Sequence, residues 1–326
     1  MTKIDFICPT HKNRLNLDEK KEQFVCDEGC IFPIINHIPR FVTSDNYAKA
    51  FGEQWKYYQK TQLDSHTGRP ISRDRLERLA GGDLSVVAGK TVLEAGCGAG
   101  RFTEILLQSG ANVYATDLSE AVEANYDNCK SKPNYLVFQA NLLSLPIAID
   151  QFDMVFCIGV IQHTPNPEET INTLCKYVKP GGMLVIDHYP YNYPFTPSRK
   201  FLRNILIKTP HSFSFKFCRT LVAFLWPMHR FFWKHRNQLL IKNMRKGFIE
   251  LSPIVDYHDN YAELGPDLLY AWAMLDTHDT LTDFYKHLRT KEEIANTLKI
   301  AGMQSIETIY AGNGVEARAR KPKKRK

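Results

Sequence analysis

The apolar positions between residues 91 and 187 form short continuous runs that alternate with longer amphipathic segments. The short runs predict five buried strands, at 91–95, 112–116, 135–139, 152–158 and 182–187. The segments between them that have helical length are 101–108, 119–129 and 167–178. Strands that alternate with helices of about ten residues are typical of a right-handed parallel α/β sheet.

The chain before this core has a different pattern. Residues 1–44 form a separate module, in which Pro33 and Pro39 exclude a helix and favour extended chain and turns. Residues 45–80 are helix-like and aromatic, with a polar break at 65–70.

The chain after the core first loses the strand pattern and then regains it. Residues 191–289 are helical, basic and aromatic, which predicts an insert. In residues 290–326, Thr290 and Glu293 form a capping box ahead of a helix that ends at Gly302. Two extended stretches, 306–310 and 314–319, can then complete a seven-stranded, mostly parallel sheet with an antiparallel hairpin.

Composition favours a cytoplasmic globular protein. The first nine residues lack the charged and apolar segments of a secretion signal, and no apolar run is long enough to span a membrane. Eight cysteines scattered over 326 residues fit a reducing compartment better than a disulfide framework.

The net charge of +7 is distributed very unevenly. Residues 191–249 contain twelve Lys and Arg and no Asp or Glu, and residues 316–326 contain seven basic residues and one acidic residue. The rest of the chain is therefore acidic, and the two basic segments suggest where partners bind. The basic end, 321–326, is most simply a solvated tail.

A glycine-rich loop follows the first predicted strand. Gly96, Gly98 and Gly100 allow a sharp turn and a close approach of a ligand to the backbone, and the helix that follows presents its positive N-terminus. Glu94 precedes the loop, and Asp117 ends the next strand, where a carboxylate can accept hydrogen bonds from both ribose hydroxyls.

In these residues the chain resembles the class I S-adenosylmethionine-dependent methyltransferases, whose E-x-G-x-G-x-G loop matches Glu94–Gly100. The resemblance implies a Rossmann-like fold and S-adenosylmethionine as the cofactor. It assigns cofactor binding to Glu94, Gly96, Cys97, Gly98, Gly100, Arg101, Asp117, Leu118, Asn141, Leu142, Gly159 and Trp55. Asn141 stands where the family usually has Asp, and its amide still offers a carbonyl acceptor. Trp55, in the stretch Phe51–Trp55, either stacks on the cofactor or packs in the core.

The N-terminal module contains four residues with the spacing of a zinc site. Cys8 and His11 form one ligand pair and Cys26 and Cys30 form another, as in closed tetrahedral sites. The segment resembles the zinc-ribbon-like domains associated with methyltransferases, and a metal would stabilise so small a module. The alternative is a fold with reduced cysteines that has lost its metal.

Three residues after the predicted strands are candidates for catalysis. Methyl transfer mainly requires alignment, and a general base is needed only when the acceptor has to lose a proton. His163 is the first candidate, and His188 and Tyr189 are the second; a structural role is equally open for each histidine.

The basic insert has three interpretations: a lid over an anionic substrate, a peripheral membrane contact, or a nucleic-acid groove. The segment 275–285 resembles the returning segment of relatives whose insert covers the substrate, and this resemblance favours the lid. The sequence predicts an enzyme that methylates a small-molecule, sugar or lipid-linked acceptor. An RNA methyltransferase that grips RNA with the module and the insert is the alternative, and a cofactor-binding scaffold without catalysis is a second.

Overall fold

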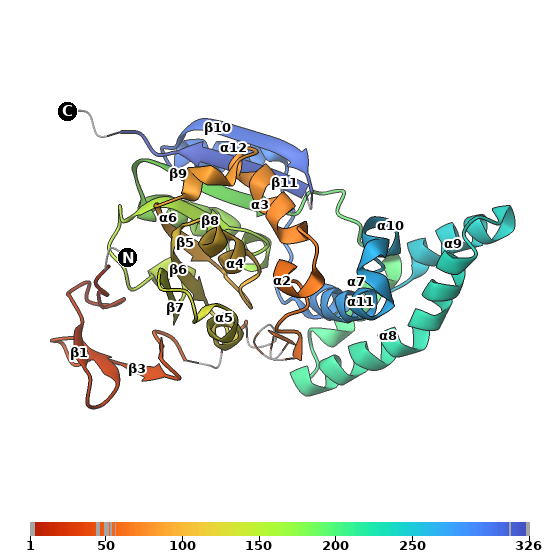
Figure 1. Ribbon diagram of the computed structural model, residues 1–326, viewed down its shortest axis with the longest axis horizontal. Coiled ribbons are helices and arrows are strands. Elements are labelled where there is room, and N and C mark those ends of the chain that lie inside the picture. Colours follow the sequence, from red (N-terminus) through yellow and green to blue (C-terminus); the bar gives the residue numbers. More distant parts are fainter. Residues whose placement is uncertain are drawn as a thin grey trace. The chain divides into compact units, whose positions relative to one another are not determined.

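The computed structural model describes residues 4–43, 46–48, 52, 54–55, 57–312 and 314–323 (Figure 1). Phe51 of the lead-in and residues 324–326 of the basic tail lie outside these ranges. The chain forms two compact units. One contains residues 194–284 with 65–69, and the other contains the rest of the chain.

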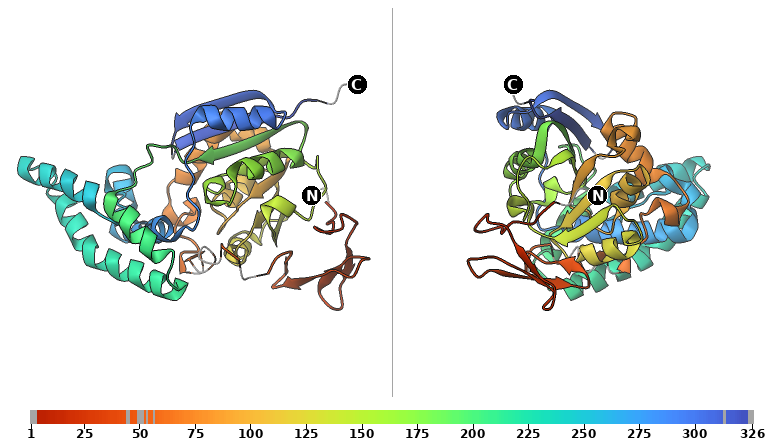
Figure 2. Two further views of the ribbon diagram at one scale, coloured as in Figure 1. Left: turned by 180° about the vertical axis from the view of Figure 1, so that it is seen from behind. Right: turned by 60° about the vertical axis from the view of Figure 1, so that its left-hand side comes forward.

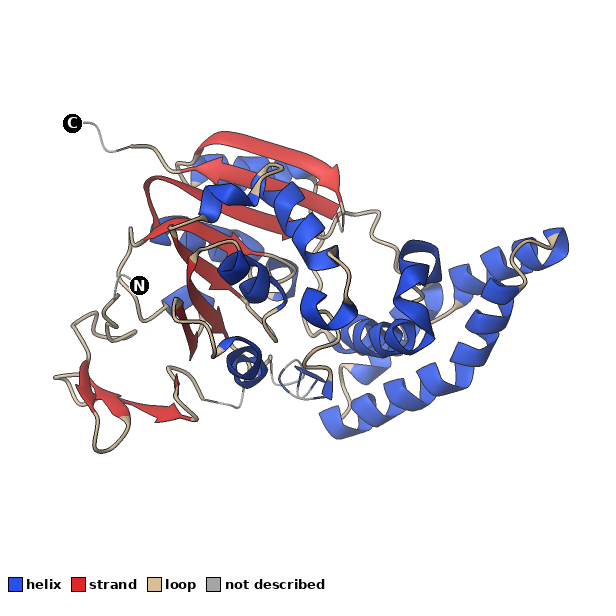
Figure 3. Ribbon diagram, in the orientation of Figure 1, coloured by secondary structure: helices blue, strands red, loops and turns tan. Residues whose placement is uncertain are grey.

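A seven-stranded sheet, whose strands are red in Figure 3, forms the centre of the larger unit. The order of its strands is β10-β11-β9-β8-β5-β6-β7. The strands are β5 (Thr91–Ala95), β6 (Asn112–Asp117), β7 (Tyr135–Gln139), β8 (Phe152–Cys157), β9 (Val178–His188), β10 (Gln304–Ala311) and β11 (Gly314–Arg320). Pairing is parallel from β7 to β9, and β11 is antiparallel to both β9 and β10. The predicted sheet and its antiparallel hairpin are therefore confirmed.

Helices cover both faces of this sheet (Figure 2). Val92, Val113 and Phe156 point to the face that packs against α3 (Ile71–Ala80), α4 (Arg101–Gln108) and α5 (Ala121–Cys129). Leu93 and Tyr114 point to the opposite face, with α6 (Pro167–Tyr177) and α12 (Lys291–Ile300). Neighbouring residues of a strand point to opposite faces, which explains why these strands are apolar throughout.

The helix predictions are largely confirmed. The helix at 101–108 has the predicted bounds, and α12 begins with the predicted capping box between Thr290 and Glu293. The polar break predicted at 65–70 is wrong in part, because α2 (Asp64–Thr67) forms a short helix there. Asp64 stabilises the first turn of the next helix, α3, by accepting hydrogen bonds from the backbone N–H groups of Ser72 and Arg73.

The N-terminal module is a small antiparallel sheet of β1 (Asn16–Asp18), β2 (Gln23–Val25), β3 (Ile31–Ile35) and β4 (Ile38–Pro39). It packs on the edge of the central sheet through Phe6, whose ring lies 5.3 Å from that of Phe138 in an edge-on contact. The buried Arg40 donates to Gln139 at the end of β7 and pairs with Glu123 at 2.9 Å. The module thereby covers the free edge of β7, which would otherwise expose unpaired backbone groups.

The second unit is helical. Its elements are α7 (Pro197–Leu206), α8 (His211–Lys234), α9 (Leu239–Leu251), α10 (His258–Tyr261) and α11 (Gly265–Thr282), with the 3-10 turn η4 (Ala262–Leu264). Pro227 lies inside α8 on its exposed side, where water can satisfy the backbone carbonyl that proline leaves without a donor. Among the described residues, no helix combines the length and the apolar character that crossing a membrane requires.

Candidate functional site

The glycine-rich loop joins β5 to α4. Gly96, Gly98 and Gly100 all have positive φ, at 81°, 48° and 98°. A Cβ on Gly96 would overlap the side chain of Val160, so only glycine fits there. The backbone of the loop is thus left bare at the carboxyl edge of the sheet, where a ligand can approach it closely.

A buried polar network of side chains from β5, α4, α5 and β7 supports the loop. Thr103 donates a hydrogen bond to Glu94 at 2.5 Å, and Asn125 donates to Thr103 at 2.9 Å and accepts one from the hydroxyl of Tyr135. Glu94 is almost fully buried, and this burial raises its pKa to about 8, although the Thr103 hydrogen bond opposes the rise. The network fixes the end of β5 and the first turns of α4 and α5 relative to each other.

Asp117 lies across the loop at the end of β6. One carboxylate oxygen accepts from the backbone N–H of Gly98 at 3.0 Å, and the other accepts from the N–H and the hydroxyl of Ser119. Burial raises the pKa of Asp117, and these hydrogen bonds work against the rise. The carboxylate is held rigidly beside the glycine loop, and the oxygen that accepts from Gly98 keeps a second lone pair for a ligand hydroxyl.

Three predicted cofactor residues make mainly structural contacts. The indole of Trp55 lies against Gly98, at the distance of ordinary packing from a Cβ placed there. Arg101 donates to the Ser72 hydroxyl at 2.9 Å and to Gln62 at 3.2 Å, which ties α4 to the chain before it. Cys97 is buried, and its backbone N–H and carbonyl hold the loop to Thr116 and Asn125.

The predicted adenine side follows β6 and β7. Asn141 caps the 3-10 turn η2 (Leu142–Ser144) by accepting from the backbone N–H of Leu143 at 3.0 Å. Leu142 is buried, while the carbonyl of Leu118 accepts from the side chain of Gln139. The carbonyl acceptor predicted on Asn141 is therefore partly engaged by its own turn.

Gly159, after β8, is exposed at the same edge of the sheet, with φ at +75° and open space around it. Its backbone N–H donates to Asp187 at 2.5 Å, and the other oxygen of this buried carboxylate pairs with Arg75. The ion pair fixes the end of β9 beside the loop after β8.

The 3-10 turn η3 (Ile161–His163) carries the first catalytic candidate. His163 is 8% exposed, and its Nδ1 lies 3.1 Å from the backbone carbonyl oxygen of Tyr285. A carbonyl only accepts hydrogen bonds, so Nδ1 carries the proton and the lone pair of the neutral ring lies on Nε2. This tautomer is the one that a general base needs when its Nε2 faces the acceptor.

His188 and Tyr189 end β9 close to this turn. The ring of Tyr189 meets that of His163 edge-on at 5.4 Å and stacks on Tyr193 at 4.1 Å. Burial lowers the pKa of His188 to about 4, and its Nδ1 hydrogen-bonds the Tyr189 carbonyl. His188 is neutral near pH 7, and its Nε2 has no hydrogen-bond partner among the described residues.

Three further residues complete this region, and none of them was among the predicted site residues. Lys286 places its ammonium 5.2 Å from the ring centre of Tyr193 and 5.5 Å from that of Tyr189. The ring of Tyr47 meets Tyr285 edge-on at 5.5 Å. Partial burial, with the negative charge of Asp117 as the next cause, raises the pKa of Tyr47 to about 12, although the side chain is still 38% exposed. Tyr47 and Tyr285 therefore link the Asp117 side of the site to His163.

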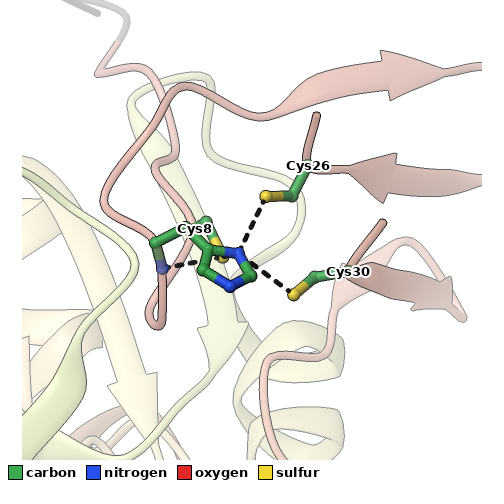
Figure 4. Close-up of side chains that lie close together, drawn as sticks. Cys8, Cys26 and Cys30 are labelled. Atoms are coloured by element: carbon green, nitrogen blue, oxygen red, sulfur yellow. Dashed lines mark hydrogen bonds between the residues drawn. The ribbon is translucent and has the colours of Figure 1, made fainter. Parts of the chain in front are cut away.

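The four predicted metal ligands converge in the N-terminal module (Figure 4). Nδ1 of His11 lies 3.7, 3.3 and 3.5 Å from the sulfur atoms of Cys8, Cys26 and Cys30, and all four ligand atoms lie within 4.8 Å of one another. In a tetrahedral zinc site, metal–ligand bonds of about 2.1 and 2.3 Å place nitrogen and sulfur about 3.6 Å apart. The donor set and its spacing therefore fit zinc.

Backbone groups also prepare these sulfur atoms for a metal. The N–H groups of His11 and Glu28 each point at a cysteine sulfur at 3.4 Å, on Cys8 and Cys26 respectively. Burial opposes ionisation of Cys26, yet hydrogen bonds from His11 and Glu28 lower its pKa to about 7. Zinc binds cysteine as the thiolate, which these contacts favour.

Known proteins share the central part of this chain. A family model described as a methyltransferase domain matches residues 93–186. A ubiquinone biosynthesis O-methyltransferase of Pseudomonas fluorescens is 32% identical over 186 residues, which are 55% of this chain and 77% of that relative. Another of the same name, from Pseudomonas paraeruginosa, is 28% identical over 185 residues, with the same two shares.

Solved structures show a weaker likeness. A crystal structure from Methanococcus maripaludis, titled as an S-adenosyl-L-methionine-dependent methyltransferase, is 12% identical. The matched region comprises 87% of this chain and 98% of the chain in that structure, and the TM-score is 0.45.

Proposed function

Because the chain belongs to the S-adenosylmethionine-dependent methyltransferases, we propose that it methylates a hydroxyl group of a small molecule. The small-molecule class is supported by relatives whose name is ubiquinone biosynthesis O-methyltransferase. The proposed acceptors include sugars and lipid-linked compounds that carry a hydroxyl group. The observation that carries it is the 3.1 Å contact of His163 Nδ1 with the Tyr285 carbonyl, which directs the lone pair of a neutral ring to Nε2. A hydroxyl acceptor would use such a base, and an already nucleophilic acceptor would not.

Cofactor binding is proposed for the loop between β5 and α4 and for the neighbouring strand ends. Asp117 binds the ribose, Gly98 and Gly100 let the cofactor approach the backbone, and Asn141 and Leu142 border the adenine. Gly159 leaves open space at the same edge of the sheet, where the acceptor would approach the cofactor. Glu94, Gly96, Cys97, Arg101, Leu118 and Trp55 hold this framework in shape.

When bound, S-adenosylmethionine supplies a methyl group activated by its sulfonium. In the proposed mechanism, Nε2 of His163 accepts the hydroxyl proton of the acceptor while the Tyr285 carbonyl holds the ring in place. Tyr189 and Tyr193 provide a stacked aromatic surface, and Lys286 above it attracts an acceptor with negative charge. His188 is neutral near pH 7 and is the second base candidate.

A screen with radiolabelled cofactor tests this function. The full chain is incubated with separate pools of phenols, sugars, lipid extract and RNA, and transfer of label is measured with the wild type and with Asp117→Ala. We expect label in a pool of small hydroxyl compounds, lost in the variant. Label in RNA alone would assign the chain to RNA methylation, and no label in any pool despite cofactor binding would favour a scaffold without catalysis.

For the N-terminal module we propose a structural zinc ion held by Cys8, His11, Cys26 and Cys30. The support is the convergence of the four ligand atoms and the fit of their spacing to a tetrahedral site. All four positions are protein ligands, so this metal would stabilise the module and take no part in the chemistry.

A further inference from the structure

We propose that the helical unit docks on a membrane surface rich in anionic phospholipids and holds one lipid phosphate in a groove between α8 and the start of α11. The surface in question comprises α8 and α9, residues 211–251, and is called the α8–α9 surface below. The inference does not depend on which acceptor is methylated.

The helix α8 carries two apolar stripes, and only one of them is covered. Its inner stripe, which includes Cys218, Val222 and Trp226, is buried within the helical unit. A second stripe follows helical spacing on the side of the helix that faces away from the buried one, and it includes Phe224, Met228 and Phe231. These three side chains are 77%, 45% and 52% exposed, respectively.

The next helix, α9, has no buried residue, although it is rich in apolar side chains. Leu239 and Leu240 are 77% and 72% exposed, and Met244 and Leu251 are also exposed. Isolated exposed apolar side chains need no explanation, but a series of them on two consecutive helices indicates an interaction surface.

The charge of the α8–α9 surface is strongly positive. It contains eight Lys and Arg and a single acidic residue, Glu250. A helix pair that combines cations with large exposed apolar groups and is nearly free of acids is typical of segments that lie in the interface of an anionic membrane.

A groove of about 640 Å³ opens between the second half of α8 and the junction of η4 with α11. Arg230, Lys234 and Arg236 line it together with Trp226, Trp233 and His258, and its lining contains no acidic residue. Among the residues that the structure describes, Arg230 and Lys234 form no ion pair. Two cations available for an anion in a concave, aromatic site are what a phosphate group would recognise.

The walls of the groove are held in position. Arg236 lies over the ring of Trp233 at 3.8 Å and donates to the Trp233 carbonyl. His258 stacks on Trp226 at 5.0 Å and hydrogen-bonds Asp256. The aromatic side of the groove is therefore formed in advance, which lowers the cost of binding.

The apolar series distinguishes a membrane from a nucleic acid. A nucleic-acid groove combines cations with aromatic rings that stack on bases. Aliphatic side chains such as Leu239, Leu240 and Met244 gain little there, whereas they are stabilised among acyl chains. The observations therefore favour lipid over RNA.

Flotation of the full chain with vesicles tests the proposal. The vesicles contain phosphatidylcholine alone or with about 30% phosphatidylglycerol. Phe224→Ser/Met228→Ser removes part of the apolar stripe, and Arg230→Glu/Lys234→Glu reverses the charge of the groove. The matched controls on the other unit are Ile300→Ser, which is 72% exposed in the wild type, and Lys299→Glu.

We expect flotation with the anionic vesicles only, lowered more than about tenfold by each double variant and unchanged in both controls. Absence of flotation, or double variants that float like the wild type, would overturn the proposal. Two further experiments measure the binding of glycerol 3-phosphate and of RNA to the full chain by calorimetry. Tight binding of either by the groove, without binding of vesicles, would assign the surface to a soluble phosphate compound or to a nucleic acid instead.

Discussion

The imidazole of His163 and the backbone carbonyl of Tyr285, 122 residues apart in the chain, are joined by a hydrogen bond of 3.1 Å. The carbonyl cannot donate, so the contact selects one tautomer of the ring. A residue from beyond the helical insert thus determines which nitrogen of His163 can act as a base.

His163→Gln should lower kcat by about 10²- to 10⁴-fold and leave the affinity for S-adenosylmethionine nearly unchanged, because the side chain acts on the acceptor. Steady-state kinetics and calorimetry measure the two quantities. The exposed His66→Gln serves as the control and should behave like the wild type. If cofactor affinity falls as much as kcat, His163 shapes the cofactor pocket and is not the base.

Asp117→Ala should weaken cofactor binding by roughly 10- to 100-fold, the range expected for the loss of charged hydrogen bonds. The exposed Asp127, which pairs with Lys130, provides the control variant Asp127→Asn. Unchanged calorimetric affinity in Asp117→Ala would contradict the assignment of the ribose site.

Glu94 should make the fold less stable as pH rises. Burial raises its pKa to about 8 from an ordinary value near 4.5, so the folded chain holds a proton that the unfolded chain has released. The free energy of unfolding should fall between about pH 5 and pH 8 by a few kcal/mol, at about 1.4 kcal/mol per pKa unit. Urea denaturation across this range should show a flatter profile for Glu94→Gln, and the exposed Glu169→Gln should keep the wild-type slope.

Gly96→Ala and Gly159→Ala form a matched pair. Both positions have positive φ, so each substitution costs about 1–2 kcal/mol of backbone strain. Only at Gly96 does the new Cβ overlap Val160, which adds about 1–3 kcal/mol. Thermal or urea denaturation should rank Gly96→Ala as clearly less stable, and equal values would show that Val160 moves aside at little cost.

The N-terminal module should contain a single zinc ion per chain. Elemental analysis of protein purified without chelators tests this, and removal of the metal should lower the melting temperature because binding energy is folding energy. Cys8→Ser should lose the metal, while Cys218→Ser, outside the module, should retain it. Metal-free wild type with an unchanged melting temperature would refute the site.

The sheet was predictable because its signals are local. Apolar runs between polar or glycine residues predict both ends of β5 and of β7 as the structure has them. Thr290 and Glu293 predict the capping box of α12. The glycine loop and Asp117 follow from the strand ends, since the carboxyl ends of parallel strands share one edge.

The acceptor side was less predictable because distant segments build it. The sequence placed residues 191–289 in one insert, yet the unit that contains the sheet resumes at Tyr285. His287 donates to the carbonyl of Gln162 and Arg289 to that of Tyr189, contacts that no local pattern encodes. The network of Thr103, Asn125 and Tyr135 could not be predicted for the same reason. These polar residues form no sequence motif and become buried partners only in the folded chain.

The hydrogen bond between the Arg289 N–H and the Tyr189 carbonyl, 2.9 Å long, brings together the points where the chain leaves the sheet and returns to it. Residues 194–284, the helical unit, are thus an excursion between two points of the chain that are held together. Loop-closure entropy rises only slowly with length, so such an excursion can be extended, shortened or exchanged at little cost to β9 and α12.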